Sequence, residues 1–74
     1  MRVGDIQLSA GTRQAYDAFG GAAALIVERG EGTINISGSA HVIGSGSVEL
    51  VCVGESCEIA ATSAVHVYIV IAKE

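Results

Sequence analysis

The last third of the chain, residues 47–72, has the clearest alternation of side-chain character. Its final run predicts a β-strand, because a wholly apolar row alternates with a second, mixed row. The first row is Val65, Val67, Ile69 and Ile71, and the second is His66, Tyr68, Val70 and Ala72. Both rows are at least partly apolar, so we expect both faces of this strand to be covered.

Shorter alternating runs predict further strands at residues 3–9, 22–29 and 33–37. The last two runs are joined by Gly30-Glu31-Gly32 and predict a β-hairpin. Residues 12–19 fit either an extended segment or a single helical turn, and the neighbouring strands favour the extended form. Residues 38–46 fit a loop with one short edge strand around His41.

The whole pattern predicts an all-β chain. Strands and turn signals recur every eight to twelve residues, and no long periodic run supports a helix. We expect a small antiparallel β-sandwich or barrel, jelly-roll-like, with six to eight short strands in a single domain covering residues 1–74.

Composition adds an expectation of self-association. A chain of 74 residues buries a limited core and often needs a partner subunit, a disulfide or a metal. Half of its residues are hydrophobic and only 16% are charged, so part of its surface is expected to be covered. We predict a homo-oligomer and favour a trimer.

Charge argues against two classes of partner. The net charge is −4, and the four basic residues Arg2, Arg13, Arg29 and Lys73 are scattered. Nucleic acids and anionic membranes both require clustered basic residues, so neither is expected as a partner. Residues 59–72 are too few for a membrane helix, and the N-terminus lacks the apolar core of a signal peptide. These features predict a chain that folds in a cytoplasm.

The two cysteines have two interpretations. If Gly54-Glu55 forms a two-residue turn, Cys52 and Cys57 lie opposite each other and can form a cross-strand disulfide. In a cytoplasm they would instead stay as reduced thiols, which is the favoured interpretation. Together with His41 and His66 they lack the spacing of a zinc site, so no metal is expected.

One surface is predicted to be a subunit interface. If the Val65–Ile71 row faces the core, then His66, Tyr68 and Val70 project from the opposite face, with Val51 and Val53 as expected neighbours. An exposed apolar patch of this kind usually marks an interaction surface.

No catalytic constellation is present in the sequence. Serine, histidine and aspartate occur in no recognised motif, and the G-S-G-S run at residues 44–47 is not followed by the lysine or helix of a phosphate loop. We therefore expect neither an enzyme nor a cofactor.

Three runs resemble small accessory virion proteins of tailed bacteriophages. They are G-T-I-N-I-S-G (32–38), G-S-G-S-V-E-L-V (44–51) and E-I-A-A-T-S-A-V-H-V-Y-I-V-I (58–71). The resemblance implies a structural subunit that decorates or cements a phage capsid or another particle, or forms a head fibre, with the major capsid protein or another virion protein as a partner. It places the protein in a virion assembled in the host cytoplasm, or otherwise in the cytoplasm. The absence of proline, the two cysteines and Ser63-Ala64 in place of a Ser-Gly turn depart from the pattern, and no functional residue can be transferred.

An alternative hypothesis is a small non-enzymatic module that binds a glycan or another small ligand. Its candidate contacts are Tyr16, Tyr68, His41 and His66, and the chain has no tryptophan to stack on a sugar ring.

Overall fold

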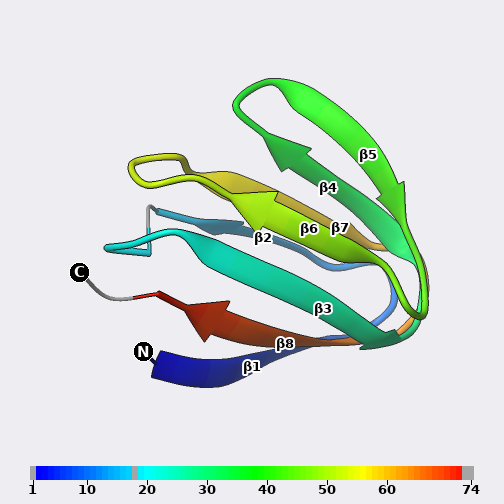
Figure 1. Cartoon of the computed structure of the whole chain (residues 1–74). Helices are drawn as coiled ribbons and strands as arrows, with labels where there is room; N and C mark the ends of the chain where they lie inside the picture. Colours follow the sequence, from blue (N-terminus) through cyan, green and yellow to red (C-terminus); the bar gives the residue numbers. More distant parts are fainter. Residues whose placement is uncertain (1, 18, 73–74) are drawn as a thin grey trace.

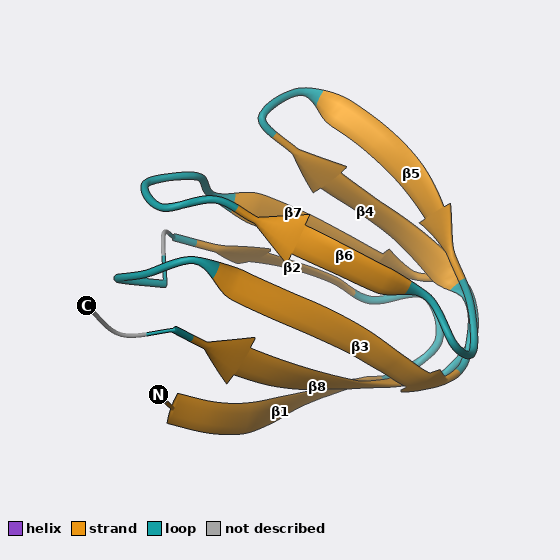
Figure 2. Cartoon of the chain, viewed as in Figure 1, coloured by secondary structure: helices purple, strands orange, loops and turns teal. Residues whose placement is uncertain are grey.

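The chain forms two packed β-sheets in the computed structural model, which describes residues 2–17 and 19–72. The described part contains eight strands: β1 Arg2–Leu8, β2 Arg13–Tyr16, β3 Ala23–Arg29, β4 Gly32–Ile36, β5 Ser39–Ile43, β6 Val48–Val51, β7 Cys57–Ala61 and β8 Val65–Ile71. Sheet A has the order β1-β8-β3-β6 and sheet B the order β2-β7-β4-β5, and all strand pairs are antiparallel (Figures 1 and 2). The predicted all-β, jelly-roll-like fold is confirmed. No described segment forms a helix long and apolar enough to span a membrane.

The core lies between the two sheets and consists of the inward row of each strand. The fully buried large side chains are Leu25, Ile34, Ile59, Val27, Val51 and Val67. The predicted inward row of β8 is confirmed for Val65, Val67 and Ile69, while Ile71 is partly buried against the core. Because the side-chain period of a strand is two, the alternate residues of β8 necessarily face outward.

The predicted hairpin of residues 22–37 does not form, and neither does the two-residue turn at Gly54-Glu55 on which the disulfide alternative depended. Residues 22–29 and 33–37 lie in different sheets, because the Gly30-Glu31 connection carries the chain from β3 in sheet A to β4 in sheet B. The carbonyl oxygen of Glu31 accepts hydrogen bonds from the backbone N–H groups of Thr62 and Ser63, so this connection packs on the one between β7 and β8. Likewise β6 and β7 belong to different sheets, and residues 52–56 cross between them.

A tight hairpin forms where the sequence suggested a loop with an edge strand. β4 pairs with β5, and Ile36 lies opposite Ser39. The two turn residues, Ser37 and Gly38, have φ angles of 50° and 85°. Positive φ at both central positions defines the type I′ turn, whose twist matches that of the flanking strands. β5 is indeed an edge strand, and it contains His41.

Gly30 is predicted to tolerate substitution less well than Gly46. Both have left-handed φ, 93° and 89°, but a Cβ at Gly30 would collide with the Ala64 carbonyl and Val65, whereas a Cβ at Gly46 meets open space. Gly46→Ala should cost about 1–2 kcal/mol of unfolding free energy, and Gly30→Ala measurably more. Urea denaturation of both variants measures the difference. Equal losses would contradict the packing at Gly30.

The two thiols are predicted to differ in reactivity. Both cysteines are free; Cys52 is exposed after β6, and Cys57 is buried at the start of β7. The disulfide interpretation is therefore wrong for this structure, because it required a β6–β7 hairpin. Burial raises the pKa of the Cys57 thiol and keeps it protonated. Mass spectrometry after iodoacetamide treatment should show one alkylated thiol in the native chain and two after denaturation. Rapid double alkylation of the native protein would contradict this arrangement.

Candidate functional site

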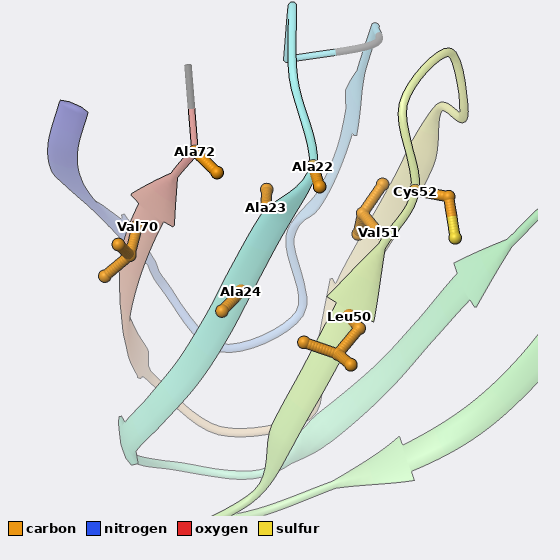
Figure 3. A pocket seen from close by; sticks show the side chains of 8 residues that line it. All are labelled: Ala22, Ala23, Ala24, Leu50, Val51, Cys52, Val70 and Ala72. Atoms are coloured by element: carbon orange, nitrogen blue, oxygen red, sulfur yellow. The ribbon is translucent and has the colours of Figure 1, made fainter. Parts of the chain in front are cut away.

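An apolar hollow opens on the outer face of sheet A. It lies at the end of the sheet where β3 begins and where β6 and β8 end, and its volume is about 360 Å³ (Figure 3). Its lining residues are Ala22, Ala23, Ala24, Leu50, Val51, Cys52, Val70 and Ala72. These residues come from three neighbouring strands and their ends, so the sheet itself forms the floor of the hollow.

The hollow exists because small side chains meet larger ones in one register. Ala24 on β3 lies between Val70 on β8 and Leu50 on β6. Figure 3 shows the short Ala24 side chain with Leu50 and Val70 on the strands at either side. The only side-chain heteroatom of the lining is the sulfur of Cys52, and no lining residue is charged. The hollow therefore suits an uncharged apolar group.

The residues of the predicted interface separate into two groups. Tyr68 and Val70 lie on the outer face of sheet A, as expected, and Val53 is 63% exposed in the connection after β6. The prediction for Val51 is wrong, because Val51 belongs to the inward row of β6 and is 1% exposed. The assignment of this face to a subunit contact stays a prediction.

The interior contains no comparable site. No polar or charged residue is buried in the described part of the chain, and its His, Cys, Asp and Glu residues form no group of three that could hold a metal ion. At one end of the interior, Tyr16 and Phe19 stack with ring centroids 6.2 Å apart and pack against the core. Burial, and then the nearby Cys57, raises the pKa of Tyr16, so the phenol is neutral.

His41 lies at the open edge between the sheets. Its Nδ1 atom is 2.9 Å from Oε1 of Glu49 on β6, so the pair joins the edge strands of sheets B and A. The His41 side chain is half exposed, and a solvated pair of this kind contributes little to stability. His41 is not among the residues that line the hollow, so it is no part of that site.

His66 connects three strands on the polar end of the same outer face. Its Nδ1 atom is 2.7 Å from Oε1 of Glu28 on β3, and its Nε2 atom is 3.0 Å from Oδ2 of Asp5 on β1. Ionised carboxylates only accept hydrogen bonds, so both ring nitrogens must donate and the ring is an imidazolium. The bond to Glu28, followed by that to Asp5, raises the pKa of His66. Tyr68 packs beside the ring with centroids 4.6 Å apart.

The fold resembles that of cupin proteins. A predicted oxalate decarboxylase from Thermotoga maritima superposes with a TM-score of 0.86 at 23% identity, covering 97% of this chain and 65% of that one. The cupin domain of a Schizosaccharomyces pombe protein gives a TM-score of 0.86 at 16% identity, covering 97% and 55%. Salicylate 1,2-dioxygenase from Pseudaminobacter salicylatoxidans gives 0.86 at 20%, covering 92% and 20%. The chain thus spans less than two thirds of each of these proteins.

No protein-family model and no curated protein sequence matches this chain. The structural likeness therefore establishes the fold, a cupin-like jelly roll, and not an activity. It also corrects the resemblance to phage virion proteins, since the structural neighbours are cupin-fold proteins. The capsid-decorating function, the capsid protein as a partner and the virion location depended on that resemblance and are withdrawn with it.

The described residues do not fit the metal centre expected of a non-haem iron dioxygenase. Such centres use two histidines and one carboxylate around open coordination positions. Here the inward row is apolar, and the two histidines lie on different sheets, His41 on β5 and His66 on β8.

The link through His66 is predicted to stabilise the fold at low pH more than at high pH. The pKa of His66 is raised in the folded chain. The two hydrogen bonds of His66 therefore contribute fully to stability below the unfolded-state pKa of about 6.5, and this contribution is lost as the pH rises through the folded-state pKa. His66→Gln should therefore lower the melting temperature more at pH 6 than at pH 9. A pH-independent difference between variant and wild type would contradict the doubly bonded imidazolium.

Proposed function

We propose that this chain is a small non-enzymatic binding module that holds a small, uncharged, apolar molecule in the hollow on sheet A. The observation that carries the proposal is the hollow itself, with its eight lining residues and its volume of about 360 Å³. Ligand pockets in proteins typically measure about 300–1,000 Å³ and are lined mainly by apolar side chains. This hollow lies at the small end of that range.

The lining favours an apolar ligand over a glycan. A sugar needs convergent hydrogen-bonding groups and an aromatic platform, whereas the hollow offers alanines, Leu50, Val70 and one thiol. Tyr16 packs against the core and His41 lies at the sheet edge, so neither contributes to the hollow. Tyr68 and His66 share the outer face but are not lining residues.

The absence of catalysis is part of the proposal. A reaction requires a nucleophile, a base and a group that stabilises developing charge, all within hydrogen-bonding reach. Cys52 is the only lining side chain with a reactive atom, and its neighbours in the hollow are all hydrocarbon. The structural neighbours include proteins named as a dioxygenase and a decarboxylase, but the match covers only 20% and 65% of those chains.

Filling the hollow should abolish binding. Ala24→Leu places three additional carbons between Leu50 and Val70 and should weaken the binding of prodan, an uncharged naphthalene dye, by at least about 10-fold. Dye fluorescence measures the affinity. The matched control is Ala40→Leu, the same change at an exposed alanine on β5 of sheet B, which should leave affinity unchanged. If Ala24→Leu binds the dye as tightly as wild type, the hollow is not the site.

A further inference from the structure

We infer that Glu55 fastens the connection between β6 and β7 to sheet B, and that it thereby positions Cys52 as one wall of the hollow on sheet A. The inference rests on the proposed function, because it names the residue that holds part of that binding site in place. The fastening itself follows from the hydrogen bonds of residues 52–56 and does not depend on any ligand.

Residues 52–56 cross from sheet A to sheet B with little backbone support. Outside the strand ladders, the described chain gives this connection one backbone hydrogen bond, from the N–H of Glu55 to the carbonyl oxygen of Cys52 at 3.1 Å. The bond closes a turn around Val53 and Gly54, and Gly54 has a φ of 85°, as the third residue of a type II turn requires. Both partners of this bond belong to the connection itself, so it does not hold the connection against either sheet.

The side chain of Glu55 supplies that attachment. Its Oε1 atom accepts a hydrogen bond from the backbone N–H of Cys52 at 2.9 Å, and its Oε2 atom accepts one from the hydroxyl of Ser37 at 2.7 Å. Ser37 lies in the β4–β5 turn directly after Ile36, which pairs with Cys57 at the start of β7. One carboxylate therefore joins the end of β6 in sheet A to a turn of sheet B.

These hydrogen bonds hold the carboxylate in its ionised form. The hydroxyl of Ser37, followed by the backbone N–H of Cys52, lowers the pKa of Glu55. The ion pairs formed among the described residues do not include Glu55. Hydrogen bonds to an ionised acceptor are shorter and stronger than neutral ones, so the attachment depends on these two donors.

The connection meets the hollow at Cys52. This residue directly follows β6, and its side chain is one of those that line the hollow (Figure 3). Leu50 and Val51 are held by their pairing with β3, but the ladder ends at Val51. The place of Cys52 therefore depends on its bonds to Glu55. If the connection loosens, the hollow spends less time in its binding form, and the ligand affinity falls by the same fraction.

Ser37→Gly tests the fastening without weakening the turn. The variant removes the hydroxyl that bonds to Glu55, and glycine adopts the φ of 50° at this position more readily than serine does. The unfolding free energy should therefore not fall, while prodan binding should weaken by about 3-fold or more. Hydrogen exchange of the Cys52 amide, measured by NMR, should become faster by a similar factor, because this N–H is bonded for less of the time.

The matched control is Asn35→Ala. This change removes the hydrogen bond from the backbone N–H of Gly38 to Oδ1 of Asn35, in the same turn, and it touches neither Glu55 nor the lining of the hollow. Prodan affinity and the exchange of the Cys52 amide should both stay at their wild-type values.

Two changes at Glu55 test its role directly. Glu55→Ala removes both side-chain bonds and should weaken prodan binding at least as much as Ser37→Gly. Glu55→Gln should keep most of the affinity, because its amide oxygen can accept from Cys52 and its amide N–H can donate to Ser37. In the Glu55→Ala chain, Ser37→Gly should have no further effect, since its partner is already gone.

The outcomes separate this inference from the proposed function. Unchanged exchange of the Cys52 amide in Ser37→Gly overturns the fastening, and faster exchange with unchanged prodan affinity overturns the positioning of Cys52. Equal losses of affinity in Ser37→Gly and Asn35→Ala assign the effect to the turn and overturn the role of Glu55. A wild-type chain that binds no prodan refutes the proposed function, whereas faster exchange in Ser37→Gly still supports the fastening. Circular dichroism confirms that each variant is folded.

Discussion

The packing of two apolar inner faces is the constraint on which the rest of this molecule depends. Ile34 and Ile59 of sheet B meet Leu25, Val27 and Val67 of sheet A, and all five are at most 2% exposed. Burying each such side chain stabilises the fold by about 1.5–3 kcal/mol, which a domain this small needs. The interior therefore holds only packed apolar side chains. The His66 link, the His41 pair and the hollow all lie on the outer faces and edges of the sheets.

Those features of the fold that depend on alternation could be predicted from the sequence. The rows of β8 and the separation of Ile6 from Asp5 in β1 follow from the period of two, which backbone geometry imposes on any strand. Pairing partners could not be predicted in this way. A short glycine-containing connection can join two strands of one sheet in a hairpin, or it can lead the chain from one sheet to the other. Residues 30–31 and 52–56 lead the chain to the other sheet. The disulfide alternative for Cys52 and Cys57 failed because it depended on that pairing.

The candidate site was missed for a related reason. Its floor combines Ala22 and Ala24 with Ala72, about fifty residues later, and only the register between β3 and β8 brings them together. Alanine carries no functional signal in a sequence, so no pattern marked these positions. The resemblance to virion proteins was misleading because glycine-punctuated, acidic β chains share a composition that many small jelly rolls can have. The outward orientation of Tyr68 and Val70, by contrast, was predictable from alternation alone.

The order of strands has a kinetic consequence for the newly made chain. Each sheet receives one of the last two strands at an inner position: β7 lies between β2 and β4, and β8 lies between β1 and β3. Until residues 57–71 leave the ribosome, β1 and β2 have no neighbour to pair with. Neither sheet can close before β7 and β8 have been made, and every strand pairing except the β4–β5 hairpin joins segments that are distant in the sequence, a topology associated with slow folding. During that interval the unpaired β edges are open to other nascent chains, so a delay in forming β7 and β8 increases the exposure of this chain to aggregation.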